Sequence, residues 1–419
     1  MKFIHTADIH LDSPLVGLAA YQDAPVQQLR TVTRDAFSRL VDAAIEEEVD
    51  FMVIAGDLYD GSWKDYNTGH YFCREMGRLN KAKIPVYLLY GNHDSESEMT
   101  KKLSLPSNVN VFESRKPSTY RIETLKVALH GRSYREAATF ENLASSYPEP
   151  IAGWLNIGVL HTALGGYAAH QPYAPCSLDE LTVKGYDYWA LGHVHEHAIL
   201  QKDPWIVYPG NLQGRHIREI GERGAVLVTA DETGIQSVER LCVDMLRWYV
   251  VDVDASVAAT LQEVASLAGR AIEQLIFEVT VPMHLALRVR IIGKTTTHGE
   301  LFGLETQLRE EILGQVASQG ADRIWVEKVK IETESSVGSL NINTRSDAIS
   351  ELQGFLDEID EDKQFHEFLL SELKPLADRA PLDLIRAVPE LNYIRSGDIE
   401  SIVKTIKSGL MDYLRTGAE

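Results

Sequence analysis

Seven side chains that can bind metal ions follow five short apolar runs of the sequence. In chain order they are Asp8, His10, Asp57, Asn92, His161, His193 and His195. Two carboxylates, one amide and four imidazoles make a mixed oxygen and nitrogen set, which suits Mn, Fe or Zn better than Ca or Mg. Seven ligands are too many for one ion but suit two ions that share a bridging carboxylate. The side chains therefore predict a two-metal site.

A two-metal site with these ligands predicts hydrolysis of phosphate esters. Two ions roughly 3.5 to 4 Å apart can hold a deprotonated water between them and neutralise both the attacking and the leaving oxygen of a phosphoryl displacement. The cysteines do not change this expectation, because Cys73, Cys176 and Cys242 are isolated and form no CxxC metal pair.

The apolar runs that precede these side chains are short and rich in β-branched and aromatic residues. This composition favours buried strands over helices. The runs are residues 3–4, 51–54, 86–89, 157–160 and 188–191. In a sheet that is covered by helices, ligands gather beyond the carboxyl ends of the strands. We therefore expect five strand ends to converge on one site.

The motifs around these residues resemble those of the calcineurin-like metallophosphoesterases. The five blocks, in the family's order, are Asp8-Ile9-His10, Gly56-Asp57, Gly91-Asn92-His93-Asp94, His161 and Gly192-His193-Val194-His195. One block alone is weak evidence, whereas five in order are strong. The resemblance implies an α/β fold in which helices enclose two facing mixed sheets, a four-layer αββα sandwich.

The same resemblance implies a role for each residue of the site. Asp57 bridges the two ions. The first ion is bound by Asp8, His10 and His195, and the second by Asn92, His161 and His193. In the family, the residue at His93 faces the scissile phosphate and protonates the leaving oxygen, for which imidazole is suited near neutral pH. Asp94 is expected to orient His93.

Three segments, followed by a small α/β segment, resemble those of the SbcD-type DNA repair exonucleases. They are residues 5–15, 56–60 and 208–215. Within these nucleases, residues 11–15 most resemble the YhaO branch. This resemblance implies a Mn²⁺-dependent DNA exonuclease, expected to act from 3′ to 5′. It also implies a homodimer formed through the catalytic domain and an SMC-like coiled-coil ATPase that docks on the helical C-terminal region. Asp60 departs from the pattern, because archaeal and eukaryotic relatives carry a His there.

The net charge of −20 keeps other functions open. A protein that binds DNA usually has a basic surface. This sequence has an overall excess of acidic residues instead. One alternative is a phosphodiesterase or phosphatase that acts on a nucleotide or another small phosphorylated compound. Another is a scaffold subunit with a vestigial site that regulates an ATPase. Local basic clusters supply the candidate substrate-binding residues Arg132, Arg215 and His216.

A chain of 419 residues should hold two or three domains. We predict a metallophosphoesterase domain at 1–245, an α/β capping domain at 246–335 and a helical partner-binding region at 336–419. In the second domain we expect strands at 247–253, 274–282, 286–292 and 324–332, with helices at 257–271 and 299–316. Residues 335–343 are a predicted linker. Three prolines should break the last region into short helices: Pro375, Pro381 and Pro389.

The composition is that of an ordinary soluble protein, with 44% apolar and 24% charged residues. No stretch of 18 or more apolar residues occurs, so we expect no membrane span. The chain starts without a cleavable signal pattern, and the isolated cysteines fit a reducing compartment. These features predict a cytoplasmic protein.

Overall fold

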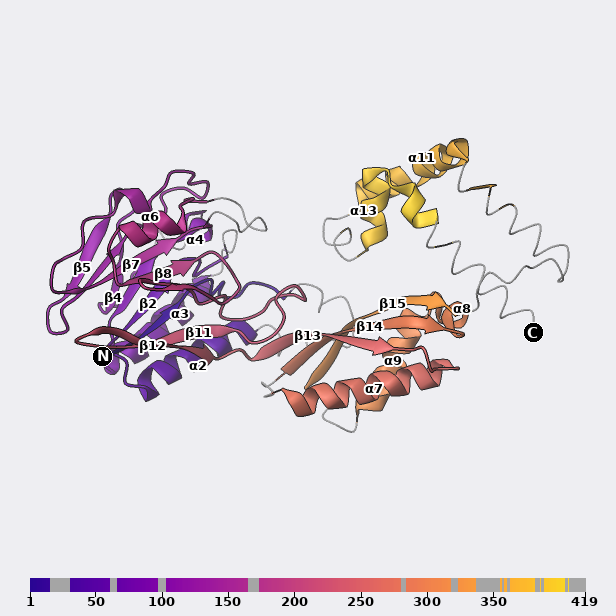
Figure 1. The fold of residues 1–419 in the computed structure, drawn as a ribbon, viewed down its shortest axis with the longest axis horizontal. Helices are drawn as coiled ribbons and strands as arrows, with labels where there is room; N and C mark the ends of the chain where they lie inside the picture. The colour runs from indigo at the N-terminus through magenta and orange to yellow at the C-terminus, as the bar shows by residue number, and fades with distance from the viewer. Residues whose placement is uncertain are drawn as a thin grey trace. The chain divides into compact units, whose positions relative to one another are not determined.

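The structure is a computed structural model (Figure 1). It describes residues 1–15, 31–60, 66–96, 103–164, 173–279, 284–317, 323–336, 362–380 and 388–403, together with 355, 358–359, 385 and 406. The chain divides into two compact units close to Trp248, the first built mainly of the residues before this point and the second of those after it. Each unit is described by itself.

The first unit contains two six-stranded sheets. The first sheet has the order β12-β11-β1-β2-β3-β4. Its strands are β1 Lys2–Thr6, β2 Phe51–Ala55, β3 Val86–Leu89, β4 Val109–Val111, β11 Gly224–Asp231 and β12 Gly234–Cys242. Strand β1 lies between β2, to which it is parallel, and β11, to which it is antiparallel. The N-terminal strand is thus an inner strand of its sheet.

The second sheet has the order β5-β6-β7-β8-β10-β9. Its strands are β5 Ser118–Ile122, β6 Val127–Gly131, β7 Leu155–His161, β8 Tyr188–Gly192, β9 Ala198–Lys202 and β10 Trp205–Tyr208. Strands β6, β7, β8 and β10 run parallel to one another, and the outer strands β5 and β9 are antiparallel to their neighbours. Both sheets are therefore mixed, as the sequence predicts.

Apolar clusters hold four layers together. Between the sheets, Phe3 stacks on Phe51 at 4.8 Å between ring centroids, and both belong to a cluster that includes Tyr188 of the second sheet. Helices α2 (Val32–Glu46) and α3 (Tyr66–Lys81) pack on the outer face of the first sheet. Helix α6 (Leu178–Val183) and the 3₁₀ turn η2 (Ala144–Ser146) pack on the outer face of the second. The predicted αββα sandwich is confirmed.

The second unit begins with a small α/β module whose three-stranded sheet has the order β13-β14-β15. Its elements are β13 Leu246–Asp254, α7 Leu261–Glu278, β14 His284–Thr295, α8 His298–Leu301, α9 Glu305–Val316 and β15 Ile324–Ser335. Buried positions at helical spacing, such as Val264, Ala268 and Ile272, line one side of α7. The α/β character predicted for this part of the chain is confirmed.

Two element predictions in this module were wrong. Residues 274–278 continue helix α7 instead of forming a strand; their apolar run mimics a strand, but Phe277 in it is 92% exposed, so the run is not a buried strand. The helix predicted at 299–316 is divided into α8 and α9, because Gly303 between them adopts a left-handed backbone with φ of 76°.

The described helices of the C-terminal region are α11 (Lys363–Arg379) and α13 (Pro389–Ser396). Pro389 stands at the start of α13, as expected of a helix-initiating proline. Pro375, however, lies inside α11 and does not end it, so the predicted break there was wrong. The position of Pro381 and most of the predicted linker at 335–343 lie outside the described residues, and the three-domain division stays a prediction.

No helix among the residues that the structure describes is both long and apolar enough to cross a membrane.

Candidate metal centre

The seven predicted ligands come together where strands β1, β2, β3, β7 and β8 end. Each side chain is the last residue of its strand or follows within a few positions. Four of the seven have a left-handed backbone, which is uncommon for residues other than glycine: Asp8 (φ 48°), His10 (φ 45°), Asp57 (φ 53°) and His193 (φ 96°). Strained backbone conformations of this kind are common at functional sites. Here the chain changes direction at these residues, just beyond the ends of the strands.

The first group of side chains consists of Asp8, His10 and His195, whose ligand atoms all lie within 4.8 Å of one another. The Nε2 atoms of His10 and His195 are 3.3 Å apart. Asp8 and His10 are almost fully buried. Two ring nitrogens and a carboxylate thus face one small volume.

The second group consists of Asp57, His161 and His193, again with ligand atoms within 4.8 Å of one another. Nε2 of His161 lies 3.4 Å from Oδ2 of Asp57 and 3.0 Å from Oδ1 of Asn92. Asn92, at the start of the short helix α4 (Asn92–Glu96), therefore belongs with this group.

Backbone hydrogen bonds join the two groups. The N–H of His193 donates to both carboxylate oxygens of Asp8, at 3.1 and 2.9 Å. The N–H of His93 donates to Oδ1 of Asp57 at 3.1 Å. Together these bonds fix the two carboxylates on which a two-metal site would depend.

The donor set fits a pair of divalent ions. Nδ1 of His161 can donate to the carbonyl of Ala55 at 2.9 Å, and Nδ1 of His195 to Oε1 of Glu219 at 2.7 Å. A histidine that donates from Nδ1 to an oxygen can bind a metal ion through Nε2, which is the usual arrangement of a metal-binding histidine. The ligand roles of the seven residues stay predictions, and the geometry is compatible with them.

At two glycines of the motifs there is no room for a side chain. A Cβ on Gly91 would collide with Oδ1 of Asp57, and a Cβ on Gly192 would collide with the carbonyl oxygen of Ala55. The backbone of each thus lies against a residue of the centre or its supporting strand. The glycines of the Gly-Asn-His-Asp and Gly-His-Val-His blocks therefore allow the strand ends to approach one another.

The carboxylates and imidazoles perturb one another strongly. Burial opposes the charge on Asp57, but His161 beside it and the nearby His10 hold the pKa of Asp57 below its usual range. Burial disfavours the charged form of His161 also, yet Asp57 raises the pKa of His161 to about 9. Burial, with a contribution from Arg215, keeps the pKa of His10 well below its usual value. Asp57 and His161 thus each favour the charged form of the other.

His93 lies at the open side of the centre, with a side chain that is 40% exposed. Its ring meets that of His10 edge to face, with centroids 5.1 Å apart. Among the predicted residues it combines access to solvent with proximity to the first group. This placement is compatible with the predicted role as general acid.

The orientation of His93 by Asp94 stays a prediction, and the contacts of Asp94 show a further role. Its carboxylate accepts three backbone hydrogen bonds, from the N–H groups of Leu58 (3.2 Å), Tyr59 (2.9 Å) and Gly91 (2.9 Å). Asp94 therefore ties the segments after β2 and β3 together, and burial raises its pKa to about 6. The carboxylate recorded next to the ring of His93 is Asp60, whose Oδ1 lies 3.4 Å from Nδ1.

The three predicted substrate-binding residues lie in different surroundings. The guanidinium of Arg132 bonds to the carbonyl of Ser114 and to the carboxylate of Glu141. Arg215 and His216 instead lie beside the centre, each with a side-chain nitrogen 3.6 Å from Oε1 of Glu219. The contacts support Arg215 and His216 as neighbours of the site and give no such support for Arg132.

Sequence reasoning missed Glu219. Burial opposes its charge, but the hydrogen bond from His195 and the nearby Arg215 lower its pKa well below the usual range. Glu219 accepts from Nδ1 of His195, so it stands directly behind a predicted ligand. It follows no strand and belongs to none of the five motifs, which is why spacing gave no signal for it.

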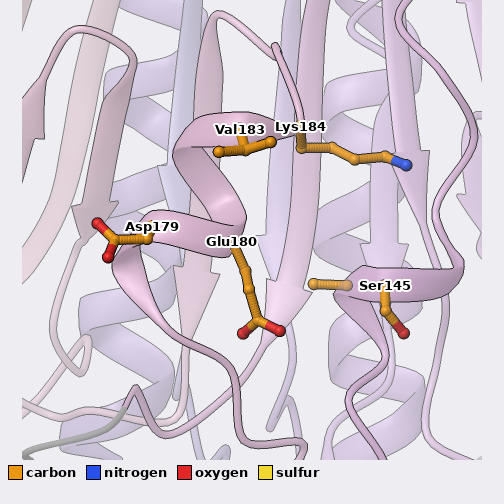
Figure 2. A pocket seen from close by; sticks show the side chains of 6 residues that line it. Ser145, Asp179, Glu180, Val183 and Lys184 are labelled. Carbon is orange, nitrogen blue, oxygen red and sulfur yellow. The ribbon is translucent and has the colours of Figure 1, made fainter.

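A separate surface hollow of about 320 Å³ lies between α6 and η2 on the outer side of the second sheet (Figure 2). Glu180 in it is engaged in the N-terminal cap of α6 with Ser177, and Lys184 pairs with Glu149. Two of its three charged groups are thus used within the fold, and none of the predicted site residues lines it.

Comparisons with known proteins agree with this centre. Residues 1–197 match the calcineurin-like phosphoesterase family, and residues 248–334 match the middle domain of metallophosphoesterase YhaO. The chain is 29% identical over 409 residues to the metallophosphoesterase YhaO of Bacillus subtilis, covering 94% of this chain and 99% of that protein.

More distant relatives are DNA double-strand break repair proteins Mre11. The match to that of Sulfurisphaera tokodaii is 25% identical and covers 61% of this chain and 66% of the relative. The match to that of Methanopyrus kandleri is 26% identical and covers 59% and 58%. Among solved structures, a dimetal phosphatase from Danio rerio aligns with a TM-score of 0.34 and 11% identity, over 58% of this chain and 98% of that one.

Proposed function

Residues 1–197 are a calcineurin-like phosphoesterase domain, and the protein is a hydrolase that acts on phosphoester bonds; from this premise we propose that it is a Mn²⁺-dependent DNA exonuclease. We further propose that it degrades strands from 3′ to 5′ in DNA repair, together with an SMC-like ATPase. The observation that carries the proposal is the convergence of two metal-binding groups with the exposed ring of His93 beside them.

The family implies a dimetal centre. The first ion would be held by Asp8, His10 and His195, and the second by Asn92, His161 and His193, with Asp57 shared. The ions would supply an activated water and neutralise charge that develops on the phosphoryl group. Mn²⁺ is proposed because the nucleases that the motifs resemble use it. The mixed oxygen and imidazole donors suit Mn²⁺ and also suit Fe or Zn.

The chain's own residues would do the remaining work. His93 would protonate the leaving oxygen, and its ring is exposed enough to reach a bound strand. Asp60 would hold the Nδ1 side of that ring. Arg215, beside the first group, would attract a phosphate of the substrate, and His216 would add a hydrogen-bond donor.

DNA as substrate is supported by the similarity to proteins that are named for double-strand break repair. The net charge of −20 favours the second candidate, a nucleotide or another small phosphodiester, because it gives a long polyanion little general attraction. Under the DNA proposal, the attraction must come from the two ions and from local arginines near the centre.

The test is a Mn²⁺-dependent digestion of end-labelled linear duplex DNA at low salt, run beside bis-p-nitrophenyl phosphate. His93→Ala is the control for contaminating nucleases. Mn²⁺-dependent shortening of DNA that is absent in the variant supports the nuclease, and the position of the label gives the polarity. Hydrolysis of the small diester with intact DNA, also after addition of the ATPase partner, would favour the second candidate.

A further inference from the structure

A partly buried loop behind the metal centre joins it to the strand that leads into the second unit. The loop comprises residues 213–219, with Glu219 at its end. It contacts the centre on one side, and on the other it contacts residues 245–248, where β13 begins. All of these residues belong to the first unit.

On the side of the centre, the contact is made by a carboxylate that is almost completely buried. Oε1 of Glu219 accepts from Nδ1 of His195 at 2.7 Å, and Oε2 accepts from the N–H of Arg215 at 2.7 Å. One carboxylate thus binds the ring of a predicted ligand and the backbone of its own loop. A displacement of the loop would therefore move the ring of His195.

On the other side, the loop is fixed by Gln213. Its Oε1 accepts from the N–H groups of Met245 at 2.8 Å and Leu246 at 3.2 Å, and its Nε2 donates to the carbonyl of Leu246 at 2.5 Å. Gln213 is 1% exposed, so these bonds are shielded from water. They attach the loop to the first residues of β13.

Trp248 completes this attachment. Its side chain is fully buried, and its Nε1 donates to the carbonyl of Gly214 at 3.0 Å. A Cβ on Gly214 would lie 2.8 Å from the carbonyl oxygen of Glu219 and 3.0 Å from the ring of Trp248. The backbone at Gly214 is therefore packed between the indole and the residue that holds His195.

We propose that Glu219 is a positioning residue for His195, and that Trp248 holds the loop 213–219 in the place where Glu219 can act. The inference rests on the two-metal centre of the proposed function. It adds residues that hold one ligand of that centre in position. The contacts of Trp248 with Gly214 and of Glu219 with His195 thus form one connected path within the first unit. The binding of the first ion would depend on this path.

The test measures metal binding by the full-length chain. Metal-free protein is titrated with Mn²⁺ in a calorimeter, and the electron paramagnetic resonance spectrum reports whether bound Mn²⁺ ions form a coupled pair. Glu219→Gln should weaken one of two sites by about 10- to 100-fold, the usual effect of losing a ligand's outer partner. Trp248→Phe should weaken the same site roughly fivefold, as expected for one lost hydrogen bond.

The matched control is Trp189→Phe. Trp189 is also fully buried and donates from Nε1 to a carbonyl, that of Leu181, at 3.0 Å, but on the outer side of the second sheet. The Trp189→Phe variant should keep both Mn²⁺ sites. The site weakened in the other two variants should be the one that His195→Ala removes, and the coupled-pair spectrum should give way to that of isolated Mn²⁺.

Three results would overturn the inference. These are unchanged Mn²⁺ binding in Glu219→Gln, equal behaviour of Trp248→Phe and Trp189→Phe, and equal weakening of both sites in Glu219→Gln. DNA cleavage plays no part in this measurement, so a failure to cut DNA leaves the inference standing. A wild-type chain that binds fewer than two Mn²⁺ ions would instead contradict the proposed two-metal function.

Discussion

Asp60 and His93 face each other at the open side of the metal centre, with Oδ1 of the carboxylate 3.4 Å from Nδ1 of the ring. The second oxygen of Asp60 accepts a hydrogen bond of 2.9 Å from the hydroxyl of Ser13, and that hydroxyl also accepts from Arg215 at 3.2 Å. The carboxylate is therefore held in place while it holds the ring.

Asp60→Asn should lower turnover about tenfold on a diester with a poor leaving group, such as a dinucleotide. The substitution weakens the contact that holds the Nδ1 side of the His93 ring. On bis-p-nitrophenyl phosphate, whose leaving group needs little protonation, the rate should hardly change. The comparison of kcat on the two substrates is the measurement. An equal loss on both would show that Asp60 acts on metal binding or folding instead.

His93→Ala should reduce turnover on the dinucleotide by roughly 10² to 10⁴, the usual contribution of a positioned acid. The backbone N–H that binds Asp57 remains in the variant, so metal content should be preserved. Mass analysis of bound metal beside the rate measurement checks both parts. Full activity in the variant would refute the assignment of His93.

Asp57→Ala should lose both ions. The carboxylate is almost fully buried, and it is the only carboxylate of the second group. As the predicted bridge it would also bind the first ion, so its loss should weaken the binding of both. The measurement is the metal content of the purified variant. Stoichiometric metal retained by a folded variant would contradict the bridging role.

Gly91→Ala should disable the centre, because the added methyl group would displace the carboxylate of Asp57. Gly77 is the matched control, since it lies within α3 and a Cβ there meets nothing within 4 Å. Gly77→Ala should raise stability by up to about 1 kcal/mol through helix propensity. Metal content and thermal unfolding of both variants are the measurements, and equal metal content would refute the steric argument.

Acid should destabilise the metal-free domain through His5. Its ring is fully buried, with Nδ1 3.0 Å from the hydroxyl of Tyr188 and Nε2 3.0 Å from the carbonyl of Leu191. Burial lowers the pKa of His5 to about 3 from its usual 6.5. Between these values the unfolded chain binds a proton that the folded one does not, so stability falls as pH decreases from 6.5 and is unaffected above it.

The expected loss through His5 is about 1.4 kcal/mol for each pH unit below 6.5, or about 2 kcal/mol at pH 5. Denaturant unfolding at pH 5 and pH 8, in the presence of a chelator, measures it. In His5→Gln the difference between the two pH values should shrink by about this amount. An unchanged difference would show that His5 does not contribute to the acid response.

The sequence predicted the centre better than its surroundings. Asp8, His161 and His193 could be predicted because each stands at the end of a strand or within two residues of it. Parallel strands that end at one edge bring their last residues together. Glu219 and Asp60 could not be assigned in this way. Their roles depend on where loops fold back, which no periodicity reports.

The boundaries of helices and strands were also predicted best where burial leaves a clear pattern in the sequence. Strands whose residues are buried throughout, such as β2 and β8, are visible as short apolar runs. The apolar residues at the end of α7 form a similar run, and only the exposure of Phe277 shows that it is not a core strand. Pro375 misled in the opposite direction, since a helix with enough bonds on both sides can continue through a proline.

The place of β1 between β2 and β11 has a consequence for biosynthesis. Strand β1 leaves the ribosome before its partner β11, which starts only at Gly224, and β12 after it ends at Cys242. At ordinary translation rates, one edge of β1 waits roughly 10 to 45 s for that partner. Throughout this interval the nascent sheet has an open inner edge, and Glu219 has not yet been anchored through Trp248. Metal loading is therefore expected to follow release of the first unit from the ribosome, not to guide its early folding.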